Sequence, residues 1–163
     1  MKRIIIILTI VALLISFIGC TKNTENFDQP AQFYYKWAST EDALFGAETR
    51  EIKSYSDDLL AVANFYFTGP DSDAYVNVFP DGLHALSLEV QENKLMLLLN
   101  DELSTLSGLE LSIACACMSM TLLELTGCTE IVIKAESKLL DGKASISMKL
   151  DDLYLLDTLI TVN

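Results

Sequence analysis

Residues 109–126 constrain the fold more than any other part of the sequence, because they are apolar nearly all the way round a helix. The apolar positions are Leu109, Leu111, Ile113, Ala114, Ala116, Met118, Met120, Leu122, Leu123 and Leu125. A surface helix carries a single apolar stripe, so a helix of this kind belongs in a core or against a partner. Gly127 follows at once and is a natural C-terminal stop. We therefore expect a domain built around one central helix.

The first half of the domain carries strand and helix patterns. Residues 32–38 are rich in aromatic side chains and predict a first strand, and residues 49–53 and 75–79 favour two short extended pieces. A helix is expected between these pieces, capped at Ser56 or Asp57, because apolar residues recur there at i, i+3, i+4 and i+7. These residues are Leu59, Val62, Ala63 and Tyr66.

The second half favours a hairpin, the central helix and further strands. Residues 85–91 alternate in part, and residues 94–100 contain a continuous apolar run at 95–99, which predicts a return strand buried on both faces. Residues 130–135 predict another strand, and an Asp-Gly pair precedes a hairpin into residues 144–150. The order β-α-β-β-α-β predicts an α+β two-layer sandwich, with two helices packed on one face of a mixed or antiparallel sheet.

The amino end carries a separate signal. A basic start precedes an apolar run at residues 4–18, which fits the apolar region of a secretory signal peptide and is shorter than the roughly 20 residues of a spanning helix. Gly19 and Cys20 follow, as in a bacterial lipobox, in which the cysteine receives acyl chains such as palmitate. We expect a lipoprotein signal peptide at residues 1–19 and lipidation of Cys20. A plain signal peptide or a membrane anchor is the alternative.

Cleavage before Cys20 defines the remaining organisation. Residues 20–31 are polar and predict a tether, and residues 32–163 predict one domain, in which residues 136–163 form a C-terminal extension. Loss of the two N-terminal bases takes the formal net charge from −12 to about −14. This acidity repels nucleic-acid phosphates and anionic lipid headgroups, so we expect no nucleic-acid partner. The membrane contact should come from acyl chains on Cys20.

Three further cysteines are Cys115, Cys117 and Cys128. The C-x-C spacing differs from the C-x-x-C of zinc and redox motifs, and on a helix its two thiols point about 200° apart. We expect buried, unpaired thiols and no metal or other cofactor. A disulfide from Cys128 to Cys115 or Cys117 stays open as an alternative, because disulfides form outside the cytoplasm.

The sequence contains no recognisable catalytic constellation. His84 is the single histidine, stands beside a turn, and is accompanied by no Gly-x-Ser-x-Gly nucleophile motif. Asp71 and Asp73 could bind a hard cation through oxygen ligands, but the loop lacks the twelve-residue pattern of a calcium site. We therefore expect no enzyme activity and no catalytic residues.

Three residues are candidates for contact with a partner. Tyr35 and Trp37 share one face of the first strand, where such aromatic residues form either a core or an exposed contact surface. Arg50 predicts either a surface salt bridge, which contributes about 0–1 kcal/mol, or a clamp for a partner's carboxylate. We take Tyr35, Trp37 and Arg50 as the candidate interaction residues.

Six pieces of the sequence match one known pattern in order. They are the Phe33-Tyr34-Tyr35 strand, the Arg50-bearing segment 48–52, the helix 59–70 with its Gly-Pro end, the Pro-Asp-Gly turn at 78–83, the return strand 95–100, and the segment 121–133 from helix to closing strand. Over these residues the chain resembles the GerMN domain, a sporulation and germination module of bacterial envelope lipoproteins. Residues after about 136 match poorly.

The resemblance implies a non-enzymatic module, similar to the ring-building domains of secretion and sporulation complexes, which pack against copies of themselves or other envelope proteins. We therefore expect a lipid-anchored protein on the extracytoplasmic face of the bacterial cell membrane. Its domain is expected to mediate protein–protein interaction or assembly, in sporulation, germination or envelope maintenance. A peptidoglycan or small-ligand binding module is the alternative, and a cell-wall hydrolase is a less favoured one.

Overall fold

The computed structural model describes residues 28–39, 44–53 and 58–153 of the chain. Its elements are β1 (Asp28–Trp37), β2 (Phe45–Lys53), α2 (Leu59–Tyr66), β3 (Tyr75–Val76), β4 (Ala85–Gln91), β5 (Lys94–Leu99), the 3-10 helix η2 (Asp101–Thr105), α3 (Gly108–Thr126), β6 (Glu130–Ala135) and β7 (Ile146–Lys149). The expected α+β class is confirmed. The predicted signal peptide at residues 1–19 and the predicted lipidation at Cys20 lie outside the described residues.

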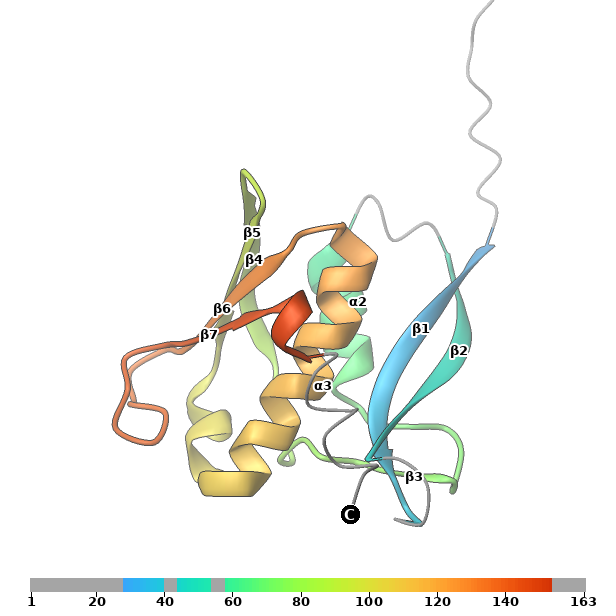
Figure 1. Ribbon diagram of the computed structural model, residues 1–163, viewed down its shortest axis with the longest axis horizontal. Helices are drawn as coiled ribbons and strands as arrows, with labels where there is room; N and C mark the ends of the chain where they lie inside the picture. The colour runs from blue at the N-terminus through green and yellow to red at the C-terminus, as the bar shows by residue number, and fades with distance from the viewer. Residues whose placement is uncertain (1–27, 40–43, 54–57, 154–163) are drawn as a thin grey trace, which may run out of the picture.

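The strands form two sheets, where the sequence led us to expect one. The smaller sheet has the order β2-β1-β3 and is antiparallel; the larger has the order β4-β5-β6-β7, and β5 and β6 are its parallel pair. Helix α3 contacts β1 in one sheet and β6 and β7 in the other. Figure 1 shows α3 between the two sheets, with both helices on the same side of the larger one.

The division into two sheets has a local cause at the edge of β1. The Tyr34 N–H donates to Thr121 Oγ1 of α3 at 2.8 Å, and the Tyr66 hydroxyl of α2 donates to the Tyr34 carbonyl. Strand β3 reaches this edge only opposite Lys36 and Trp37. Side chains from the two helices thus satisfy backbone groups that a neighbouring strand would otherwise pair with.

Helix α3 is the centre of the core, as its apolar sequence predicts. Its residues from Leu111 to Leu123 are buried except for Ser112. By length and composition α3 could cross a membrane, but 67% of its apolar window is buried inside the protein, as in the core helix of a soluble domain. Gly127 ends it in the left-handed conformation with φ 69°, which glycine adopts without strain.

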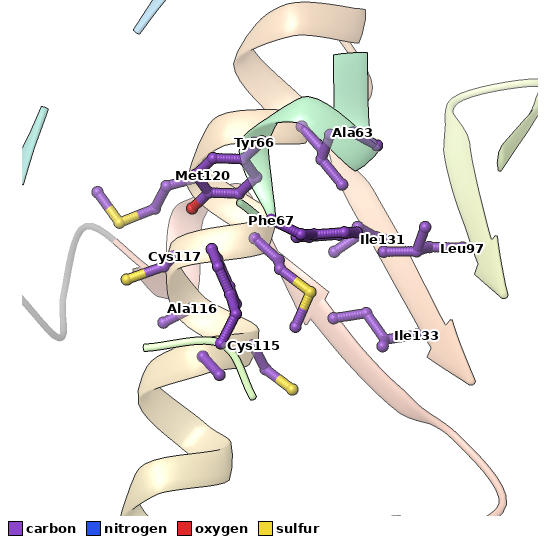
Figure 2. Close-up of a cluster of buried hydrophobic side chains, with 14 of the residues drawn as sticks. Ala63, Tyr66, Phe67, Leu97, Cys115, Ala116, Cys117, Met120, Ile131 and Ile133 are labelled. Atoms are coloured by element: carbon purple, nitrogen blue, oxygen red, sulfur yellow. The ribbon is translucent and has the colours of Figure 1, made fainter. Parts of the chain in front are cut away.

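The packing around α3 joins all layers. Figure 2 shows Met120 and Cys117 of α3 beside Tyr66 of α2, while Leu97 and Ile131 of the larger sheet lie on the other side of the cluster. The Tyr66 ring also contacts rings of the smaller sheet and of the loop after β3; they are Phe33 at 5.4 Å, Tyr35 at 5.1 Å and Phe79 at 4.9 Å between centroids. Tyr66 therefore packs α2 against the rest of the core.

Several element boundaries differ from the sequence-based expectations. Strand β1 begins at Asp28, so the last four residues of the expected tether are strand that pairs with β2. Strand β2 is longer than expected because it pairs along nearly all of β1, and β3 is shorter. The cap of α2 is Asp58, whose carboxylate accepts from the Ala61 N–H at 2.9 Å.

Candidate functional site

The three predicted interaction residues lie together on the smaller sheet. Tyr35 and Trp37 are on β1, and Arg50 is on β2 opposite Ala31. In an antiparallel pair, opposed residues share a face, so all three side chains are on the same face of the sheet. This face contacts α2, because the Tyr35 and Tyr66 rings lie 5.1 Å apart.

Arg50 is only 7% exposed and makes ionic and hydrogen-bonded contacts. Its Nη2 donates to Glu48 Oε2 at 2.9 Å and to the Gly69 carbonyl at 2.8 Å. Its Nε lies 3.3 Å from Asp71 Oδ2 in an ion pair. The Glu48 side chain is itself only 13% exposed, so this pair is largely removed from water. Arg50 thereby holds β2 to the turn that follows α2.

Aromatic rings enclose the same guanidinium. Arg50 Cζ lies 5.5 Å from the Phe33 centroid, 5.7 Å from that of Tyr35 and 5.2 Å from that of Phe65, within the range of cation–π attraction. Its Nη1 is buried and has no hydrogen-bond partner among the residues that the structure describes. Arg50 is therefore an internal cation, and the structure does not present it to a partner's carboxylate.

Tyr35 is fully buried, and its hydroxyl donates to the Tyr66 carbonyl at 3.1 Å. Burial raises the pKa of Tyr35 above its ordinary value. Trp37 is half-buried and packs on Tyr75, with 4.5 Å between ring centroids. Of the three candidates, only Trp37 retains exposed surface, so the described structure offers no contact surface made of Tyr35, Trp37 and Arg50 together.

The outer face of the larger sheet is a better candidate surface, and sequence reasoning missed it. The predicted burial of β5 on both faces is wrong: Leu95, Leu97 and Leu99 are buried, whereas Met96 and Leu98 are only half-buried. The cause is that helices cover one face alone, as Figure 1 shows. Among the described residues, no element packs on the other face. In the sequence, the unbroken apolar run of β5 was the signal that could have indicated this surface.

The registers arrange this outer face in rows. Met96 lies opposite Val132, and Leu98 lies opposite Lys134 in the neighbouring strand. Lysine and glutamate residues flank this apolar centre; they are Lys94, Glu130 and Lys149 in one row, with Lys94 Nζ 3.0 Å from Glu130 Oε2. We call Met96, Leu98 and Val132 with these flanking charges the outer-face patch. In a chain of net charge −12, a surface that carries several lysines is distinctive.

A shallow cavity of about 270 Å³ lies where the start of α3 meets the segment after β3. Its lining residues are Lys36, Val76, Asn77, Val78, Phe79, Pro80, Leu106, Glu110 and Ile113. Its volume is below the roughly 300–1,000 Å³ of typical ligand pockets, and Glu110 is the only acidic residue in its lining. This cavity therefore gives little support to a glycan site or to a pair of catalytic carboxylates.

The remaining candidates have structural surroundings. Cys115, Cys117 and Cys128 are buried and unpaired, as expected, and Figure 2 shows Cys115 and Cys117 on opposite sides of α3. His84 is exposed, with Nδ1 3.0 Å from the Gly82 carbonyl. Asp73 is exposed in its loop. Across the described residues, no group of three or more His, Cys, Asp or Glu is placed to hold a metal ion.

Comparison with known proteins rests on structure. No protein-family model matches the sequence, and no curated protein matches it. The tandem GerMN domains of the sporulation protein GerM from Bacillus subtilis are similar, with a TM-score of 0.59 and 18% identity over 78% of this chain and 47% of that chain. This domain has a GerMN-like fold. At this identity the likeness extends to the fold alone, and the present chain spans about half of the GerM structure.

A second solved structure also resembles the GerMN-like domain. It is a candidate lipoprotein from Clostridium perfringens, with a TM-score of 0.49 and 16% identity over 82% of this chain and 95% of that chain. The likeness that bears on the sequence resemblance is the one to the GerMN domains of GerM, and it concerns the fold.

Proposed function

We propose that this chain is a lipid-anchored envelope protein whose GerMN-like domain binds other proteins on the extracytoplasmic face of the cell membrane. The domain acts by adhesion, without a cofactor and without catalysis. The processes that the likeness to the sporulation protein GerM suggests are sporulation, germination and envelope maintenance.

The observation that carries this proposal is the outer-face patch. Met96, Leu98 and Val132 are only partly buried at the centre of a sheet face that no described element covers. An apolar surface rimmed by polar residues is typical of protein contact sites. The lysines around it favour a partner whose surface is apolar and rimmed by carboxylates. An envelope protein of that chemistry is the occupant that we infer.

The anchor part of the proposal rests on the amino-terminal sequence. An acyl-modified Cys20 would hold the domain close to the membrane, because the seven residues from 21 to 27 that precede β1 reach at most about 25 Å. Intact-mass measurement and fractionation test it with a Cys20→Ser variant. We expect the wild-type protein to be in the membrane fraction and to carry added acyl mass. The Cys20→Ser variant should lack the added acyl mass and the membrane attachment. An unmodified, full-length chain in the soluble fraction would remove the anchor from the account.

Crosslinking and capture from membranes tests the binding part. Leu98→Asp places a charge at the centre of the outer-face patch, and we expect it to reduce capture of the partner about tenfold or more. Leu109→Asp is the matched control, because Leu109 is 73% exposed at the start of α3, away from the larger sheet's outer face. Equal capture by both variants, or retention on peptidoglycan in place of protein partners, would contradict the proposal.

A further inference from the structure

The shallow cavity at the start of α3 collects groups from three parts of the chain. Lys36 comes from the end of β1, Glu110 from the first turn of α3, and Val78 from the segment after β3. Because side chains alternate along a strand, Lys36 lies on the opposite face of the smaller sheet from Tyr35, whose face contacts α2. The cavity therefore lies between α3 and the face of β1 that α2 leaves uncovered.

The cavity carries one cation and one carboxylate that are not paired inside the chain. The ion pairs found among the described residues are those of Arg50 and Lys94, and neither Lys36 nor Glu110 takes part in them. Lys36 is half-buried, and Glu110 is exposed. Both charges are therefore available to a ligand that carries the two opposite charges itself.

The rest of the lining combines apolar side chains with main-chain polar groups. The apolar residues are Val76, Val78, Phe79, Pro80, Leu106 and Ile113. Within the described part of the chain, the N–H and C=O of Val78 have no hydrogen-bond partner. A few polar groups on an apolar wall fix the orientation of a bound molecule. The lining therefore suits a small ligand that has an apolar part and charged groups of both signs.

We propose that this cavity binds a free apolar amino acid in its zwitterionic form. The carboxylate of the ligand pairs with the Lys36 ammonium, its ammonium pairs with the Glu110 carboxylate, and its side chain packs on Phe79 and Ile113. A volume of about 270 Å³ suits a ligand of this size, because sites of roughly 300–1,000 Å³ hold larger, drug-sized molecules. A single pair between exposed charges contributes little, so binding requires both charges of the ligand.

This site goes beyond the proposed function and is separate from the outer-face patch. The cavity is formed by β1, the segment after β3 and the start of α3, whereas the patch belongs to β5 and β6. We therefore expect Leu98→Asp to leave amino-acid binding unchanged and Glu110→Gln to leave partner capture unchanged. Loss of amino-acid binding in a folded Leu98→Asp variant would contradict the assigned place of the site.

Titration calorimetry of the full chain in mild detergent tests the ligand class, with L-valine, L-leucine and L-phenylalanine as probes. We expect at least one of them to bind with one-to-one stoichiometry. The amide of that amino acid lacks the carboxylate, and its deaminated acid lacks the ammonium. Each of these two compounds should bind at least tenfold more weakly, because each loses one charge-assisted contact. No saturable binding of any probe at millimolar concentrations, or equal binding of the amide or the deaminated acid, would overturn the proposal.

Charge-removing variants test whether the binding takes place in the cavity. We expect Lys36→Met and Glu110→Gln each to raise the dissociation constant of the amino acid at least tenfold. The controls are Lys138→Met and Glu102→Gln, which remove exposed charges outside the cavity lining and should leave the dissociation constant unchanged. The amino acid should also raise the thermal unfolding midpoint of the wild type and not that of Glu110→Gln, whose exposed side chain makes it a variant that still folds. A dissociation constant for Glu110→Gln equal to that of the wild type would overturn the proposal.

Discussion

Arg50 illustrates how a residue can resemble a surface contact in sequence and be internal in the fold. Removing its charge leaves the nearly buried Glu48 carboxylate without its partner. We predict that Arg50→Met lowers the free energy of unfolding by about 3 kcal/mol, because breaking one half of a buried ion pair strands the other charge. Arg50→Lys should cost less, since it keeps the charge and loses the forked geometry. Urea denaturation measures both.

A double variant provides the control for this prediction. If the stranded carboxylate is the cause, Glu48→Gln combined with Arg50→Met should cost less than the sum of the two single changes. An Arg50→Met variant within about 1 kcal/mol of wild type would show that the pair lies in water.

Thr121 is predicted to hold β1 through its hydroxyl. Thr121→Val keeps the shape of the side chain and leaves the Tyr34 N–H without this acceptor, which should cost about 1–3 kcal/mol of unfolding free energy. The control is Ser112→Ala on the same helix, whose exposed hydroxyl donates to the Gly108 carbonyl one turn earlier. That change should be nearly neutral by thermal unfolding. Equal losses in the two variants would contradict the assigned role.

The buried thiols predict a loss of stability at alkaline pH. Burial raises the pKa of Cys115 from its ordinary value of 9.0 to about 12, and it raises the pKa of Cys117 in the same direction. The folded state thus keeps protons that the unfolded state releases. The contribution of these protonated thiols to the free energy of unfolding is complete below about pH 9. It is lost as the pH rises towards 12, by up to about 1.4 kcal/mol per pH unit for each thiol. The urea concentration at the midpoint of unfolding should decrease from pH 7.5 to pH 9 and decrease further at pH 10.

Cys115→Ala is the control for this pH dependence, because it removes one titrating group and should reduce the slope above pH 9. Native protein should also react slowly with a thiol reagent at pH 8, and unfolded protein should react quickly. A flat dependence between pH 7.5 and 10 would contradict the buried placement of the thiols.

At the scale of elements, the β1–β2 ribbon depends on a close approach between Gly46 and Trp37. A Cβ atom at Gly46 would lie 2.4 Å from Trp37 Cε2, so Gly46→Ala must displace the indole ring. We predict a cost of about 1–3 kcal/mol and a shift in emission of the single tryptophan. Ala47→Ser, at the next position, should change neither the free energy of unfolding nor the tryptophan emission. Unaltered fluorescence in Gly46→Ala would mean that this contact is absent.

The same ribbon shows where sequence reasoning stops. The alternation in β1 places Tyr35 and Trp37 on one face, but alternation does not say which face α2 will cover. Tyr35 became core because Tyr66, thirty-one residues later, packs on its ring. Likewise, the apolar run of β5 correctly marks a central strand, whereas the uncovered outer face depends on both helices packing on one side. Packing between residues far apart in the sequence decides which face of each strand is covered, and the local sequence pattern does not contain this information.

For the whole molecule, the class and element order follow from local signals: the all-round apolar α3, its Gly127 stop and the strand–helix–hairpin sequence. The division into two sheets does not follow from local signals, because it arises when the side chains of Thr121 and Tyr66 bond to the edge of β1. The candidate surface was likewise out of reach, since Met96, Leu98 and Val132 come together only through the parallel pairing of β5 with β6.

Photo-crosslinking in membranes tests the central claim, that the GerMN-like domain binds an envelope protein through the uncovered face of its larger sheet. A photo-reactive residue at Leu98 is compared with one at Ser112, on the exposed side of α3. The account predicts a discrete crosslinked species of higher mass from position 98, containing a second envelope protein, and none from position 112. Crosslinks of equal yield from both positions, or only lipid adducts at position 98, would contradict it.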